Sequence, residues 1–200
     1  MEETKNRKKV FGVGVMDIKK PNNATYMLKK AYSAWTSMLS RCYNPSFQEK
    51  TPSYIGCVVC EEWKTFSSFY MWFLRNYIEG YHLDKDIIKK GNKIYCPEFC
   101  SFVPPEINYV VLTCKRRRGN LPIGVCLDKH KKKYQSGYTI SKYGKHNFVY
   151  LGVFDTAAEA FDAYKTSKQQ YLKTIAESYK ETIDVRIYNA LMNYKIEITD

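Results

Sequence analysis

The stretch from residue 121 to 175 contains three strand-like segments followed by one helical pattern, and this order constrains the fold more than any other feature. Residues 121–128, 133–142 and 147–154 have the composition of strands. Gly119-Asn120 precedes the first segment, and Tyr143-Gly144-Lys145 supplies turn residues between the last two. We therefore predict a three-stranded antiparallel sheet.

A helix is predicted directly after the third strand. Thr156 and Glu159 form a Thr-x-x-Glu capping box, which marks a helix start. Residues at helical spacing then make one face, to which Lys168 contributes its aliphatic stem: Phe161, Tyr164, Lys168, Tyr171, Leu172 and Ile175. With the helical patterns nearer the N-terminus, this predicts an α+β chain in which a sheet packs on one helix.

This region resembles the AP2 DNA-binding domain. The resemblance is carried by Gly124-Val125, Tyr134-x-Ser136, the run Tyr-Leu-Gly-x-Phe-Asp-Thr at 150–156, Glu159-Ala160 and Ala163-Tyr164. In that family the sheet lies in the DNA major groove, and an aromatic residue at the position of Tyr150 packs on the backbone. The resemblance implies double-stranded DNA as the partner. Near the start of the second strand, Lys133 and Gln135 are our candidates for base contacts.

Positive charge is concentrated in the same region. Between Lys115 and Lys145 the sequence has ten lysines or arginines and one acid, Asp128, which gives +9 of the chain's net charge of +12. A dense basic segment interleaved with tyrosines is typical of nucleic-acid binding, and a solvated face without a partner is the alternative. The predicted DNA-binding residues are Arg116, Arg117, Arg118, Lys131, Lys132, Lys133, Gln135, Lys142, Lys145 and Tyr150.

Composition argues against several other classes. An anionic membrane could also attract the charge, but there is no long apolar run and no basic amphipathic helix, so no membrane partner is expected. The N-terminus lacks the apolar stretch of a secretory signal, which favours the cytoplasm, or the host cytoplasm if the chain is phage-encoded. Neither a Gly-rich phosphate loop nor a hydrolase triad is present, so no small-molecule cofactor is expected. We expect a monomer.

The segment from Leu83 to Asn108 reads as a strand, a loop rich in Lys and Gly, a second strand and a helix start at Pro104-Pro105-Glu106. This order brings Asp84, at the end of the first strand, close to Asn108 in the first turn of the helix. A carboxylate oxygen and an amide oxygen can provide two protein ligands for a hard divalent cation. The alternative is an Asp in an Asx-turn and an unrelated Asn near a helix start.

The same segment resembles the ββα-metal finger of HNH homing endonucleases. Asp84 falls on the first metal ligand, Asp86 on the second acid, Gly91-Asn92-Lys93 on the loop and Asn108 on the helical ligand. The resemblance implies a metal-dependent DNA endonuclease of phage homing type, with one Mg²⁺ or Mn²⁺ at Asp84 and Asn108. The family's catalytic His is replaced by Lys85. The alternative is a catalytically inactive DNA-binding regulator or counter-defence protein.

Two residues are candidates for the role of the missing His. A lysine is ordinarily a poor base at neutral pH, but as a cation Lys85 could bind the scissile phosphate. His82 lies two residues before Asp84 and points to the same face of a regular strand, so it could act as the base. A surface His without a function is the alternative for His82.

Four cysteines flank the predicted finger, and the chain has seven in all. Cys57, Cys60, Cys96 and Cys100 would suit a structural Zn²⁺ as four thiolates. The spacing from Cys96 to Cys100 is loose for such a site, so buried, reduced cysteines are favoured over zinc.

The N-terminal region is predicted to be helical. Trp35, Met38, Leu39 and Cys42 recur at helical spacing within 31–42, and a second aromatic series runs from Trp63 to Tyr77. We predict these aromatic series to form the core. The predicted organisation is residues 1–114 with the finger at 80–114, a basic linker at 115–120, an AP2-like domain at 121–180, and a C-terminal helix and tail at 181–200.

Overall fold

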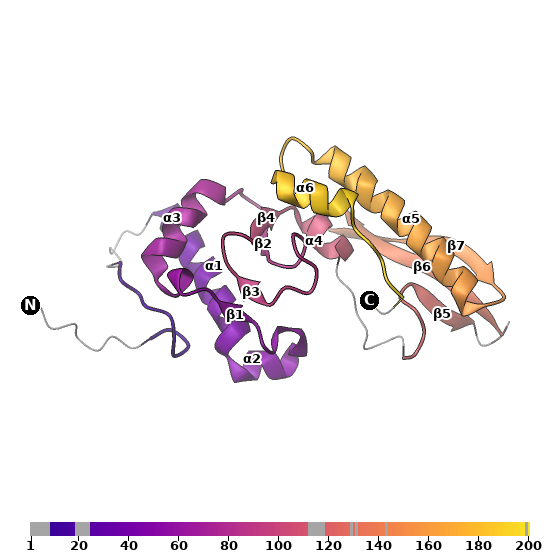
Figure 1. Cartoon of the computed structure of the whole chain (residues 1–200), viewed down its shortest axis with the longest axis horizontal. Coiled ribbons are helices and arrows are strands. Elements are labelled where there is room, and N and C mark those ends of the chain that lie inside the picture. The colour runs from indigo at the N-terminus through magenta and orange to yellow at the C-terminus, as the bar shows by residue number, and fades with distance from the viewer. Residues whose placement is uncertain are drawn as a thin grey trace, which may run out of the picture. The chain divides into compact units, whose positions relative to one another are not determined.

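The protein is a mixed α+β structure, as the sequence predicts, with a three-stranded antiparallel sheet toward the C-terminus (Figure 1). This computed structural model describes residues 9–18, 25–111, 119–128, 130, 132–142, 144–198 and 200. The chain divides into two compact units, Met1–Phe102 and Val103–Asp200. The predicted boundary at 115–120 lies later, and most of that linker falls outside the described residues.

Two long helices form the centre of the N-terminal unit. Helix α1 spans Tyr26–Tyr43 and begins five residues before the predicted start, because the Thr25 side chain caps it by accepting a hydrogen bond from the amide of Leu28. Helix α3 spans Phe66–Asn76. Between them lie side chains that are fully or almost fully buried: Trp35, Met38, Leu39, Trp63, Phe66, Phe69 and Phe73. The prediction that the aromatic series form the core is therefore confirmed.

Short elements connect α1 to α3. Asn44 ends α1, and its side chain caps α2 (Pro45–Lys50), a short helix that the sequence pattern did not predict. A 3₁₀ turn (Pro52–Tyr54), strand β1 (Val58–Val59) and a second 3₁₀ turn (Glu62–Lys64) follow. Val15, near the N-terminus, makes a parallel bridge to Thr65 at the start of α3.

The predicted finger contains three short strands where the sequence suggested two. Strand β2 (His82–Asp84) pairs with β4 (Ser101–Val103), whereas β3 (Ile94–Tyr95) pairs in parallel with β1. The chain turns at Cys96–Cys100, where the amide of Cys100 donates to the carbonyl of Cys96. This turn divides the second predicted strand into β3 and β4. Helix α4 (Pro105–Val111) follows directly and belongs to the C-terminal unit.

The C-terminal unit is built on the sheet β5–β6–β7. Strands β5 (Val125–Asp128), β6 (Lys133–Lys142) and β7 (Lys145–Phe154) run antiparallel with β6 in the centre. Strand β5 starts later than predicted, and β7 starts earlier because Lys145 already pairs with Lys142. Strand β5 therefore begins four residues after its predicted start, and β7 begins two residues before its predicted start.

Helix α5 (Ala157–Ser178) lies across one face of this sheet, and α6 (Val185–Met192) packs beside α5 (Figure 1). The predicted capping box is present: Thr156 and Glu159 exchange side-chain and backbone hydrogen bonds. The predicted face of α5 is buried or half-buried, and Ile187 and Leu191 bury the inner side of α6. Among the described residues, no helix has the length and apolar character needed to cross a membrane.

Candidate nucleic-acid interface and finger region

The two faces of the C-terminal sheet have different roles. Ser136 and Tyr138 point toward α5, since the Ser136 hydroxyl donates to the carbonyl of Ala160 and the Tyr138 ring contacts Tyr164 and Tyr171. Because side chains alternate along a strand, Gln135, Gly137 and Thr139 lie on the other face. We call this the outer face. Helices α5 and α6 pack on the opposite face, whereas the ring of Tyr109 of α4 contacts His146, which pairs with Ser141 at the hairpin end of the outer face.

A β-bulge places two aromatic side chains on the outer face. The register between β6 and β7 shifts between Ser136 and Gly137, so that Gly137 pairs with Tyr150 and Leu151 is the extra residue. Tyr150 and Phe148 are each 56% exposed. A Cβ on Gly137 would lie 2.3 Å from the Phe148 ring and 2.6 Å from the carbonyl oxygen of Val149. The glycine therefore allows the Phe148 ring to lie close against β6.

Polar side chains occupy the rest of the outer face. Gln135 is directly opposite Cys126 on β5, and the Cys126 thiol donates to Gln135 Oε1 at 3.6 Å. Lys133 forms an ion pair with Asp155 at 2.8 Å, which raises the pKa of Lys133. Both partners are well exposed, so the pair contributes little to stability and can open. Lys132 and Lys145 are exposed near the two ends of β6.

Part of the predicted basic surface cannot be located. Arg116, Arg117, Arg118 and Lys131 lie outside the described residues, as does the side chain of Lys142. The described part of the prediction therefore rests on Lys132, Lys133, Gln135, Lys145 and Tyr150. The sequence reasoning did not select Cys126 or Phe148. Cys126 and Phe148 can be placed on the same face as Gln135 and Tyr150 only when the strand register and the bulge are known.

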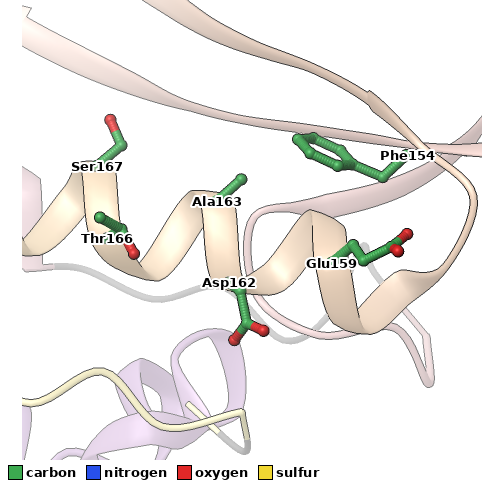
Figure 2. A pocket seen from close by; sticks show the side chains of 6 residues that line it. All are labelled: Phe154, Glu159, Asp162, Ala163, Thr166 and Ser167. Atoms are coloured by element: carbon green, nitrogen blue, oxygen red, sulfur yellow. The ribbon is translucent and has the colours of Figure 1, made fainter.

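The helix side of the sheet has a different chemical character. An open groove runs along α5, with Phe154 of β7 facing Ala163 and Ser167 (Figure 2). Its other lining residues include two exposed carboxylates, Glu159 and Asp162, and Thr166. Carboxylates repel a polyanion, so this side is less suited to nucleic acid than the outer face.

Lys168 is an unusual residue on the buried face of α5. Only 6% of it is exposed, and its Nζ lies 4.6 Å from the centroid of the Tyr138 ring. Burial lowers the pKa of Lys168 to about 8. The sequence predicted burial of its aliphatic stem, and the residue as a whole is buried. It borders a small cavity lined by Val110, Val111, Ile123, Tyr164, Leu172, Tyr194, Ile196 and Asp200.

In the finger region, Asp84 organises the backbone that follows it. Its Oδ1 accepts hydrogen bonds from the amides of Asp86 and Ile87, both at 2.8 Å. The side chain is 9% exposed, and burial raises the pKa of Asp84 above its usual range. This is the Asx-turn geometry that the sequence left open as an alternative. Among the described residues, Oδ2 takes no part in this turn and could bind a cation.

The ammonium of Lys85 is held within the finger loop. Its ammonium donates to Asp86 Oδ1 at 2.6 Å and to the carbonyl of Asn92 at 3.0 Å, and the residue is 4% exposed. The rings of Tyr54 and Tyr95 lie 5.8 and 5.7 Å from Nζ. These contacts tie the ammonium to the loop between β2 and β3.

The loop of the predicted finger is fastened by the same set of residues. The side-chain amide of buried Asn92 donates to the carbonyls of Lys85 and Ile94, and Gly91 has a positive φ of 74°. His82, the other candidate base, is exposed at the start of β2. Asn108 is half-buried in α4. Asp84 and Asn108 belong to different compact units, so the two-ligand metal seat remains a prediction.

The cysteines of the N-terminal unit are free thiols. Cys57, Cys96 and Cys100 are buried and Cys60 is half-buried. Burial raises the pKa of Cys60, Cys96 and Cys100, which favours the protonated thiol. Within the described ranges, no three His, Cys, Asp or Glu side chains are grouped to hold a metal ion.

No protein-family model, curated protein or solved structure matches this chain. The resemblances to the HNH finger and to the AP2 domain therefore remain predictions from sequence motifs. What the protein does has to be argued from the surfaces and buried groups described above.

Proposed function

We propose that the protein binds double-stranded DNA through the outer face of the sheet β5–β6–β7. The observation that carries this proposal is the combination on the outer face of Gln135 with the exposed rings of Phe148 and Tyr150. Amide and hydroxyl groups can contact base edges, and aromatic rings can pack on sugars and on thymine methyl groups. Glu159 and Asp162 lie with α5, and the carboxylates near the outer face, Asp128 and Asp155, lie beside Lys133.

The lysines at the ends of β6 fit a positioning role. Lys132 and Lys145 are exposed and lie at opposite ends of this long strand. Cations placed there can bind the phosphates that flank the bases contacted by the centre of the sheet. Phosphate contacts fix the protein on the duplex, whereas Gln135 and its neighbours would distinguish sequences.

The proposal is tested by measuring affinity for a labelled DNA duplex over a range of salt concentrations. Lys132→Gln and Lys145→Gln should each lower the slope of log affinity against log salt by about one. Tyr150→Ala should weaken binding with little change of slope. Lys173→Gln is the matched control, because Lys173 is exposed on α5 and away from the outer face. A slope near zero, or an equal effect of Lys173→Gln, would contradict the proposal.

Metal-dependent DNA cleavage is a second candidate function. It is favoured by the order of β2, β4 and α4, which puts Asp84 at the end of a strand and Asn108 on the helix that follows the paired strand. The ion pair that ties buried Lys85 to exposed Asp86 favours instead an inactive DNA-binding regulator. Either way, DNA is the partner, and the difference concerns the finger alone.

A supercoiled plasmid incubated with Mg²⁺ or Mn²⁺ separates these two possibilities. If the finger cleaves, Asp84→Ala should abolish nicking while DNA binding by the C-terminal sheet persists. Lys85→His restores the base of the family, and general-base catalysis is typically worth about 10²–10⁴-fold in rate. If neither the wild type nor Lys85→His cuts the plasmid, the inactive regulator is the better description.

A further inference from the structure

Cys126 and Gln135 form a cross-strand pair at the centre of the outer face. They are directly opposite in the register of β5 and β6, and the Cys126 thiol donates to Gln135 Oε1 at 3.6 Å. Cys126 is exposed, whereas the other described cysteines are buried or half-buried. Gln135 is half-buried and has Val153 of β7 on its other side. The carboxamide is therefore held at its oxygen end by the neighbouring strand.

This contact changes what Gln135 can offer to a partner. A carboxamide has one acceptor end and one end with two donors. The thiol takes one of the two acceptor sites of Oε1 and holds the carboxamide by its oxygen end, while Nε2 has no hydrogen-bond partner among the described residues. The two Nε2 donors are therefore the groups most available to a partner. The outer face thus presents a double donor where a free glutamine would present a donor and an acceptor.

In the major groove, adenine and guanine differ in how well they match a glutamine with both ends free and a glutamine that offers only its donors. A glutamine with both ends free pairs with adenine, which offers the N7 acceptor and the N6 donor. Guanine offers two acceptors, N7 and O6. A carboxamide restricted to its donors therefore matches guanine better than adenine.

We propose that Cys126 is a positioning residue that occupies the oxygen of Gln135 and so directs Gln135 to guanine in the bound duplex. The proposal rests on the proposed function, since it applies only if the outer face contacts DNA. It names one base in the target and a residue, Cys126, that sets this preference without touching the base. Neither the preference for guanine nor the role of Cys126 follows from the charge of the surface.

The test is a selection of bound duplexes from a randomised pool under reducing conditions. Gln135→Ala should lose the preference at one position of the selected sequence, where the wild type takes guanine. Cys126→Ala frees Oε1 and should shift that position toward adenine by roughly fivefold or more, the lower range of a bidentate base contact. Cys126→Ser keeps a donor opposite Oε1 and should retain guanine. Thr166→Ala, on the groove beside α5, should select the wild-type sequence.

The possible failures are distinguishable. If Cys126→Ala selects the same guanine as the wild type, Cys126 does not position Gln135, although DNA binding by the sheet stands. If Gln135→Ala changes no position, the base contact itself is wrong. If the wild-type protein selects no sequence and its affinity is independent of salt, the proposed function fails as well.

Discussion

Replacement of Lys168 by Met should stabilise the C-terminal unit at neutral pH. Lys168 is 6% exposed, and the described residues give its ammonium the face of Tyr138 but no carboxylate or hydrogen-bond acceptor. Removing a charge from water without pairing it is unfavourable. Methionine keeps most of the length of the side chain and fills an irregular apolar space well. The substitution therefore removes the unfavourable charge and keeps the packing.

The magnitude follows from the shift of the pKa. Burial lowers the pKa of Lys168 from 10.5 to about 8. At about 1.4 kcal/mol for each pKa unit, holding the ammonium charged costs the folded state about 3 kcal/mol at neutral pH. The cation–π contact with Tyr138 offsets roughly 0.5–2 kcal/mol of this cost. We expect Lys168→Met to raise the free energy of unfolding by about 1–3 kcal/mol at pH 7.

The difference between the wild type and the variant should depend on pH in a defined direction. The folded-state pKa of Lys168 lies below the unfolded-state value, so between about pH 8 and 10.5 the unfolded chain binds more protons. The wild type therefore gains stability, relative to Lys168→Met, as the pH rises through this window. Below about pH 8 both states of the wild type are charged at Lys168, and the advantage of the variant is complete.

Urea denaturation followed by circular dichroism at several values between pH 7 and pH 10.5 measures both effects. Lys173→Met is the control, because Lys173 is exposed on the same helix and should leave stability nearly unchanged. The reasoning is refuted if Lys168→Met is less stable than the wild type at pH 7. It is also refuted if the difference between them is constant across the pH range.

Two further substitutions, one in each unit, test contacts within that unit. Gly137→Ala should displace Phe148, whose ring would lie 2.3 Å from the new Cβ, and should lower the free energy of unfolding by about 1–3 kcal/mol in thermal denaturation; an unchanged melting temperature would mean that Phe148 moves freely. Lys85→Met should loosen the loop before β3, since it removes the hydrogen bonds to Asp86 and Asn92, and amide hydrogen exchange at Ile87 and Ile94 should become faster. Unchanged exchange would show that Lys85 does not hold this loop.

Local chemistry determined much of the C-terminal unit from the sequence alone. The capping box at Thr156 and Glu159 and the apolar face of α5 depend on residues three to four positions apart, so they are visible in the chain itself. The turn before Lys145 likewise predicted the β6–β7 hairpin. The class of the fold and the core aromatic residues followed from the same short-range periodicity.

Only the tertiary structure decided which side chains share a surface. The bulge at Ser136 and Gly137 puts Tyr150 on the outer face, and the register of β5 puts Cys126 opposite Gln135. A shift of one residue would send these side chains to the opposite face, and no local pattern fixes that register. The candidate interface therefore depended on strand pairing, although its individual residues were partly predicted.

Long-range contacts also decided the roles of two lysines. The ammonium of Lys85 lies over the ring of the distant Tyr54, and Lys168 lies under the ring of Tyr138. In the sequence, each is simply a cation in a strand or helix pattern, and its burial depends on segments that pack over it from elsewhere in the chain. The sequence determined the elements and most of their inner faces. Whether a charge is paired, buried or exposed was decided by packing between elements, because the free energy of a charge depends on everything that surrounds it.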